Sequence, residues 1–150
     1  MMKKLAVSLT AATLFSGVAV ADEYEKQIDA RKAQMTIIAY NMGILGSMAK
    51  GQMDYDAATA SAAAGNLSMA ASMDQMGLWP TGSSEGEADD TKAKMAIWKD
   101  MNDFDNLFMG LKTASVSLAD AAGNGLPALR GAIGDVGKTC KGCHSDYKSK

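Results

Sequence analysis

Both cysteines and the only histidine of the chain lie within one pentapeptide, Cys140-Lys141-Gly142-Cys143-His144. Residues three and four positions apart share one face of a helix, so these three side chains can be directed at one flat ligand. Two sulfurs at this spacing can add across the two vinyl groups of a haem to give thioethers, while the adjacent imidazole reaches the iron. The pattern predicts a c-type haem attachment site with Cys140 and Cys143 bound covalently.

Two cysteines at this spacing have three other possible roles besides haem attachment. A Cys140–Cys143 disulfide would close a loop too short to stabilise a fold much, but it remains the alternative for a non-haem helical protein. A zinc site needs about four ligands, and the sequence offers no second cysteine pair or further histidine. A thioredoxin-like redox pair is expected in a βαβ setting, and nothing β-like precedes Cys140.

The position of the motif limits where the second axial ligand of the iron can come from. Six residues follow His144 in the sequence. The usual second axial ligand of c-type cytochromes, a methionine far downstream of the motif, is therefore not expected. We expect whatever faces the other side of the iron to come from upstream.

The N-terminal segment has the features of a secretory signal. Met1-Met2-Lys3-Lys4 is basic, the run from Leu5 to Val20 is apolar, and Ala19-Val20-Ala21 is an A-x-A cleavage signal. We predict a signal peptide over residues 1–21, export to the periplasm and a mature domain over residues 22–150. The apolar run is shorter than the about 20 residues of a membrane span, and no second one follows, so no span is expected after cleavage.

Charge and motif content exclude several function classes. Loss of Lys3 and Lys4 from the 15 basic residues leaves 13 against 17 Asp and Glu, a net charge of −4. A nucleic-acid-binding protein would need a basic face, so no nucleic-acid partner is expected. No catalytic triad, carboxylate pair or phosphate-binding loop is recognisable, and we do not expect an enzyme.

Apolar residues recur at three- and four-residue steps and predict helices. We expect four, over about residues 23–50, 54–76, 91–122 and from Pro127 through the haem motif. The segment from Gly77 to Asp90 reads as a polar connection, in which Trp79 is expected to fold back onto an apolar surface. The predicted fold is all-α, an antiparallel up-down-up-down four-helix bundle with haem c attached to the C-terminal helix.

The mature chain resembles the class II c-type cytochromes, the family that includes cytochrome c′. The match runs from the first helix to the C-terminus, and its elements are Arg31-Lys32, Lys50-Gly51 with Tyr55-Asp56, Trp79, Ile97-Trp98, Gly134-Asp135-Val136-Gly137 and Cys140 to Lys148. Family members are four-helix bundles with a haem-binding motif close to the C-terminus.

The resemblance implies roles for individual residues. It implies that His144 is the proximal iron ligand and that Arg31 lies near a haem propionate, with Lys32 beside it. Met35, one helical turn after Arg31, matches the position that overlooks the sixth coordination site. Two further residues are assigned to the haem surroundings, Trp79 and, near the proximal imidazole, Lys148.

The expected function is one-electron redox at a single haem iron, with an unidentified periplasmic redox partner. The resemblance also implies binding of nitric oxide or carbon monoxide if the sixth site is vacant. The alternative is a six-coordinate, low-spin electron-transfer cytochrome in which Met35 is the sixth ligand. A homodimer through the first two helices is a further implication of the resemblance.

Overall fold

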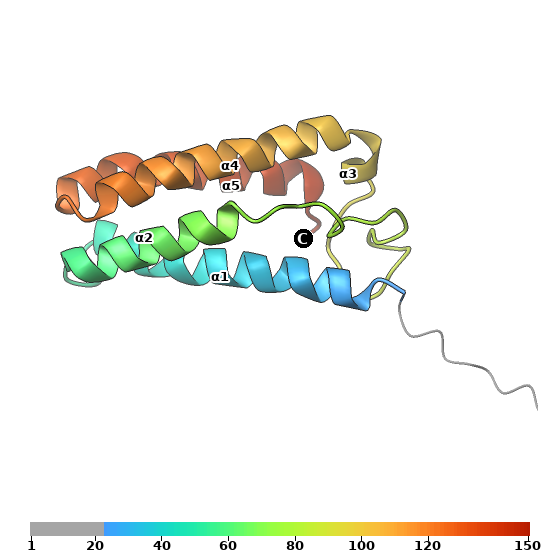
Figure 1. Ribbon diagram of the computed structural model, residues 1–150, viewed down its shortest axis with the longest axis horizontal. Helices are drawn as coiled ribbons and strands as arrows, with labels where there is room; N and C mark the ends of the chain where they lie inside the picture. Colours follow the sequence, from blue (N-terminus) through green and yellow to red (C-terminus); the bar gives the residue numbers. More distant parts are fainter. Residues whose placement is uncertain (1–22) are drawn as a thin grey trace, which may run out of the picture.

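Four long helices form an antiparallel bundle in the computed structural model, which describes residues 23–150 (Figure 1). The helices are α1 (Glu25–Ala49), α2 (Ala57–Ala71), α4 (Met101–Ala122) and α5 (Leu126–Tyr147), and α3 (Ala96–Lys99) is a single short turn. Helix α4 packs against α2 and α5, and α1 packs against the same two helices. The predicted up-down-up-down bundle is confirmed, whereas the predicted signal peptide over residues 1–21 lies outside the described residues.

The ends of α2 show where local hydrogen bonds compete with the helix. Asp56 caps its start, because the carboxylate accepts the Thr59 N–H at 2.7 Å. The helix ends at Ala71, five residues before the expected Met76. Just beyond that end, the carboxylate of Asp74 accepts the N–H of Met76 at 2.9 Å and stabilises a turn in place of a helix.

The prediction of one helix over residues 91–122 is wrong in its first part. Residues 91–95 are not helical, and Asp100 separates α3 from α4 with φ −143° and ψ 70°. The Asp100 carboxylate accepts the Asp103 N–H at 3.0 Å, so it acts as an N-cap for α4. Gly125, with φ 103°, ends the turn between α4 and α5, in a backbone conformation that glycine adopts without strain.

The connection over residues 72–95 closes one end of the bundle. Figure 1 shows it passing across the end where α5 finishes. It is tied to the C-terminus by the Lys94 N–H, which donates to the Tyr147 carbonyl at 3.0 Å, and by Ser149 N–H to Lys92 carbonyl at 2.9 Å. Ser83 and Ser84 are fully buried, so this segment is more than the solvated connection that its polar composition predicted.

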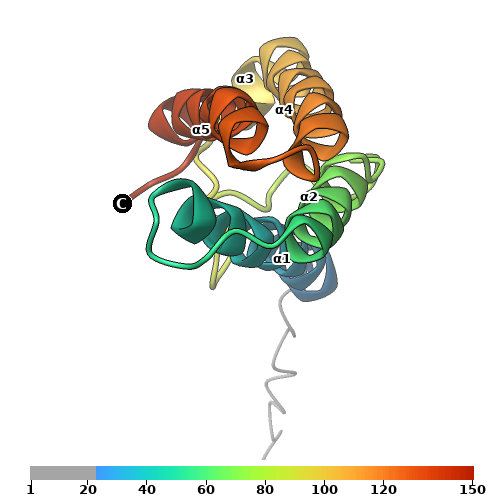
Figure 2. The same ribbon diagram turned by 90° about the vertical axis from the view of Figure 1, so that its left-hand side faces the viewer.

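Two clusters of buried side chains make up the core. The larger cluster fills the middle of the bundle, where the alanines of α2 and residues such as Leu45, Leu67 and Leu118 pack together. The smaller cluster lies at the end closed by the connection and contains Ile97, Phe104, Phe108 and Tyr147. Figure 2 shows the four helices surrounding this interior.

At the opposite end of the bundle, Tyr55 connects the segment between α1 and α2 to the turn between α4 and α5. The Tyr55 hydroxyl donates to the Ala122 carbonyl and accepts the Gly125 N–H, each at 2.9 Å. Within residues 23–150, none of the helices is both long and apolar enough to cross a membrane.

Candidate functional site

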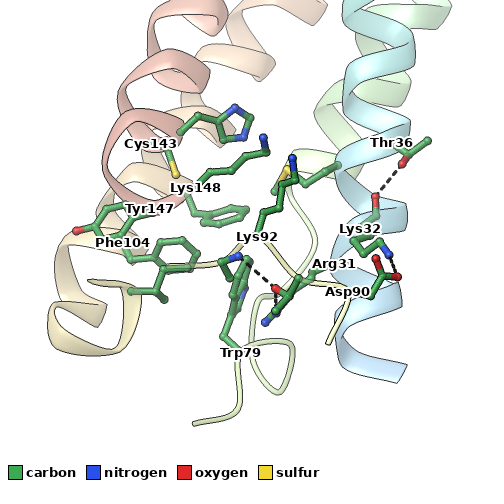
Figure 3. A pocket seen from close by; sticks show the side chains of 16 residues that line it. Arg31, Lys32, Thr36, Trp79, Asp90, Lys92, Phe104, Cys143, Tyr147 and Lys148 are labelled. Atoms are coloured by element: carbon green, nitrogen blue, oxygen red, sulfur yellow. Dashed lines mark hydrogen bonds and ion pairs between the residues drawn. The ribbon is translucent and has the colours of Figure 1, made fainter. Parts of the chain in front are cut away.

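A cavity of about 530 Å³ lies at the end of the bundle that the connection closes (Figure 3). Its volume is within the range of about 300–1,000 Å³ that small-molecule and cofactor sites occupy. One wall comes from α1, one from α5, and the rest from α4 and the connection. The residues predicted from the sequence that line it are Arg31, Lys32, Met35, Trp79, Cys143, His144 and Lys148.

The cysteine and histidine motif lies on the last two turns of α5. Cys140 and Cys143 are both free thiols and half-buried. Cys140 packs against the larger core cluster and does not line the cavity, whereas Cys143 packs against the aromatic cluster and does. His144 follows Cys143 at the cavity wall, as the helical spacing predicted.

The surroundings of the motif favour the uncharged forms of its side chains. Burial raises the pKa of the Cys140 thiol. Burial, followed by the negative charges of Cys140, Asp146 and Asp103, raises the pKa of Cys143 to about 11. Burial and then the positive charge of Lys148 lower the pKa of His144, so the imidazole is neutral at neutral pH. A neutral imidazole is the form that binds a metal.

Arg31 is the most strongly held polar side chain of the cavity. It is 3% exposed, and its guanidinium donates to the Ser83 hydroxyl at 2.9 Å and to the Ser83 carbonyl and Thr91 hydroxyl at 2.6 Å each. The guanidinium also stacks on Trp79, with Cζ 4.6 Å from the ring centroid. Burial lowers the pKa of Arg31. No carboxylate within residues 23–150 forms an ion pair with it.

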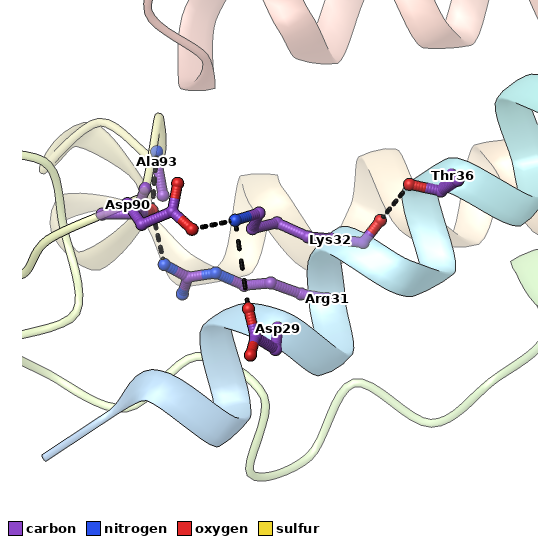
Figure 4. A network of polar contacts seen from close by, with 7 residues as sticks. Asp29, Arg31, Lys32, Thr36, Asp90 and Ala93 are labelled. Carbon is purple, nitrogen blue, oxygen red and sulfur yellow. Dashed lines mark hydrogen bonds and ion pairs between the residues drawn. The ribbon is translucent and has the colours of Figure 1, made fainter. Parts of the chain in front are cut away.

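Lys32, the neighbour of Arg31, is arranged differently. Its ammonium is paired with Asp90 and lies 3.9 Å from the Asp29 carboxylate (Figure 4). Its side chain is 45% exposed, so the pair lies at the rim of the cavity rather than inside. Lys92 and Lys148 also line the cavity, and neither forms an ion pair with an acid of residues 23–150. Figure 3 shows Lys148 beside Cys143.

The floor of the cavity is aromatic. Trp79 packs edge-to-face on Phe104 at a centroid distance of 4.7 Å, and Phe104 packs in turn on Tyr147 at 5.4 Å. The Tyr147 hydroxyl donates to the Asp103 carboxylate at 2.7 Å, which fixes the end of α5 against α4. The expectation that Trp79 folds back onto an apolar surface is confirmed.

Several residues of the site were not singled out in the sequence. Ser83 and Thr91 hold Arg31, while Phe104, Phe108 and Tyr147 form the apolar floor. The three aromatic residues could have been found from their helical spacing, because Phe104 and Phe108 are four apart and Tyr147 follows Cys143 by four. No signal in the sequence identifies Ser83 and Thr91, which lie in a polar segment without periodicity.

The cavity fits a haem on two features of its own. A buried guanidinium without a carboxylate partner lies at one side, where it can receive the acidic substituents of a macrocycle. Apolar and aromatic side chains, among them Phe104 and Phe108, line the cavity together with the imidazole of His144 and the thioether of Met35. Helical bundle, apolar cavity and Cys-x-x-Cys-His motif together define a bundle-type c-type cytochrome.

Comparison with known proteins gives the family. Residues 26–148 match the family described as Cytochrome C'. Cytochrome c-554 from Cereibacter sphaeroides is 42% identical over 130 residues, covering 87% of this chain and 85% of the relative, and cytochrome c′ from the same organism is 39% identical over 150 residues, covering 100% and 99%. The chain belongs to the cytochrome c′ family.

Solved structures agree with this assignment. Cytochrome c′ from Rhodobacter spheriodes superposes with a TM-score of 0.82 at 40% identity, covering 85% of this chain and 98% of that one. A variant of cytochrome c prime from Alcaligenes xylosoxidans, solved as its nitric oxide complex, gives a TM-score of 0.73 at 31% identity and covers 84% and 95%. The protein is therefore a cytochrome c′-like haem protein.

Proposed function

We propose that this protein carries one haem c in the cavity between α1 and α5 and works without substrate turnover. The observation that supports this most directly is that Cys143 and His144 of α5 face a cavity of about 530 Å³ whose other walls hold an unpaired guanidinium and a thioether. Bound there, the haem would supply one-electron redox chemistry and an iron that can take a diatomic gas such as nitric oxide or carbon monoxide.

The residues of α5 would provide covalent attachment and the proximal ligand. The sulfurs of Cys140 and Cys143 lie three residues apart on the helix and would form the two thioether bonds. His144 presents a neutral imidazole at the same wall. The hydrogen bond from Tyr147 to Asp103 holds this last turn against α4, and so limits the movement of His144.

Arg31 would bind a propionate. Its hydrogen bonds to Ser83 and Thr91 fix the guanidinium in place, while the positive charge stays without an acidic partner. Lys92 and Lys148 add positive charge around the same cavity. Lys32 is engaged with Asp90, so we assign it to closing the rim rather than to direct contact.

Met35 would form the distal lid. Its side chain is half-buried and packs against both core clusters, which supports a packing role over a free thioether that swings to the iron. A bulky apolar side chain over a vacant coordination site admits small diatomic ligands and hinders larger ones. The Alcaligenes relative was solved as a nitric oxide complex, which supports gas binding by this protein.

The second candidate makes Met35 the sixth iron ligand, and the protein a low-spin electron carrier. It is favoured by the same placement, since Met35 lies at the cavity wall one turn after Arg31 and a thioether is flexible and polarizable. The two candidates differ in what happens to the spectrum when the thioether is removed.

The experiment is the visible absorption of the reduced haem-loaded protein before and after carbon monoxide, for the parent and for Met35→Ala. Our proposal predicts a high-spin ferrous spectrum in both and faster carbon monoxide binding by Met35→Ala. Met42→Ala is the matched control, because Met42 lies on α1 in the larger core cluster and does not line the cavity. A low-spin parent that Met35→Ala converts to high-spin would establish the second candidate instead.

We also propose a periplasmic location. Residues 1–21 would direct export and be removed before Asp22.

We propose in addition a homodimer that uses the outer face of α1. Ile37 and Tyr40 are 47% and 69% exposed on α1 and lie about one turn apart, so they form an apolar strip on one face. A related cytochrome c′ with a TM-score of 0.74 and 28% identity, covering 83% of this chain and 95% of that one, is described by a ligand-controlled dimer dissociation.

A further inference from the structure

A second groove, of about 700 Å³, lies on the other side of the aromatic wall from the haem cavity. Trp79 and Phe108 line both. The groove is bounded by the end of α2, the turn that follows it and the first half of α4. Four of its lining residues are methionines, Met73, Met76, Met101 and Met109.

Core packing does not account for these methionines. Met73 is 47% exposed, Met109 62% and Met76 87%, so most of their surface faces water. Apolar surface left in water is unfavourable relative to burial, and polar side chains are common at such exposed positions. What the exposed side chains have in common, and a polar residue would lack, is a soft sulfur.

Hydrogen bonds in the turn after α2 fix the backbone of two of these methionines. The Asp74 carboxylate accepts the N–H of Met76 at 2.9 Å, and the Gln75 amide donates to the Met73 carbonyl at 2.8 Å. The Gln75 carbonyl oxygen accepts the Trp79 indole N–H at 3.2 Å. The Met-x-x-Met turn is therefore anchored to the aromatic wall.

The opposite side of the groove is one face of α4. Met101, Asp105 and Met109 follow one another at four-residue steps and so lie in a row along the helix. Trp79 packs on Phe104 at 4.7 Å, which sets the connecting segment alongside the start of α4. Met73 and Met76 come just after the end of α2 and line the same groove as this row. Figure 1 shows the end of α2 lying beside α4.

We propose that Met73, Met76 and Met109, the three most exposed methionines of the groove, form a binding site for a soft monovalent cation, Cu(I). Thioether ligands select Cu(I) over hard divalent ions. Within residues 23–150 there is no cluster of three or more His, Cys, Asp or Glu side chains suited to a metal, so the groove offers little to a hard cation. The carboxylates of Asp74 and Asp105 supply negative charge in the groove, and Lys112 also lines it.

This site is separate from the haem cavity, and its test measures Cu(I) binding by the methionine sulfurs rather than haem attachment. The haem-loaded protein, with any residual thiol alkylated, is titrated anaerobically with Cu(I) against a chromogenic Cu(I) chelator. In parallel, Ag(I) is added as a redox-inert probe to protein labelled with ¹³C in the methionine methyl groups. We expect one equivalent of Cu(I) to be bound and the methyl signals of Met73, Met76 and Met109 to shift together.

The variant M73L/M76L/M109L keeps apolar side chains of similar volume and removes only the three sulfurs. It should bind Cu(I) at least tenfold more weakly, while its far-ultraviolet circular dichroism stays that of the parent. M53L/M95L is the control, because both methionines are exposed but neither lines the groove, and it should bind like the parent. Absence of Cu(I) binding, equal affinity of the triple variant and parent, or methyl shifts confined to other methionines would overturn the proposal.

Discussion

The guanidinium of Arg31 lies 4.6 Å above the ring of Trp79, so a residue of α1 and a residue of the long connection form one structural unit. The same guanidinium reaches Ser83 and Thr91, further along that connection. Figure 4 shows how Arg31 and Lys32 leave neighbouring positions of α1 and meet the connection separately. Arg31 thus joins the wall of the cavity to its floor.

Replacement of Arg31 by methionine should destabilise the fold. Hydrogen bonds of a charged group contribute about 1.5–3 kcal/mol, and a cation–π contact about 0.5–2 kcal/mol, so we expect a loss of about 2–4 kcal/mol in the free energy of unfolding. Unfolding by guanidinium chloride, followed by circular dichroism, measures this loss of stability. Arg130→Met is the control, since Arg130 is exposed and makes one hydrogen bond, to the Ala49 carbonyl, and should cost under about 1 kcal/mol. Equal losses in the two variants would show that the connection is held by other contacts.

Tyr147 should make stability fall at high pH. The hydrogen bond to Asp103, followed by burial and the negative charges of Asp103, Asp100 and Asp146, raises the pKa of Tyr147 to about 12. An unfolded tyrosine has a pKa of about 10, so the protonated phenol contributes stability fully below about pH 10 and loses it as the pH rises to about 12. Unfolding by denaturant at several pH values should show this loss in the parent and not in Tyr147→Phe. Tyr40→Phe serves as the control and should follow the parent. A parent and Tyr147→Phe with the same pH dependence would contradict the assignment.

A charge on the outer face of α1 should separate the proposed dimer. Ile37→Glu and Tyr40→Glu each place a carboxylate in the strip that would be buried between copies, where an unpaired charge is costly. Sedimentation equilibrium should give a dimer for the parent and a monomer for each variant. Met53→Glu changes an apolar residue that lies after α1 and is about as exposed as Ile37, and it should remain dimeric. A monomeric parent would show that the strip has another use.

Periodicity in the sequence predicted the bundle because the long helices bury one face each. The expected ends of the first helix lie within two residues of the observed ones, Glu25 and Ala49. The errors occur where an aspartate competes with the helix for backbone N–H groups. Asp74 follows the premature end of α2, and Asp100 interrupts the helix that was expected to start near Thr91. Periodicity alone carries no information about that competition.

The site was predictable to different extents for its two walls. The spacing of the motif identifies the α5 wall without any structure, and Cys143 and His144 line the cavity as expected. Cys140, in contrast, packs against the larger core cluster. Arg31 and Met35 on the α1 wall were identified only by resemblance, and their residue types alone indicate a surface charge and a core side chain. The partners of Arg31 depend on how residues 72–95 fold, which local sequence does not determine.

The intact mass of the protein under denaturing conditions tests the central claim most directly. Covalent attachment predicts the mass of residues 22–150 plus one haem, which remains with the chain because thioether bonds survive denaturation. Replacement of both Cys140 and Cys143 by alanine should return the mass of the polypeptide alone. A parent chain without haem that is two hydrogens lighter than its reduced form would show a Cys140–Cys143 disulfide and contradict the account.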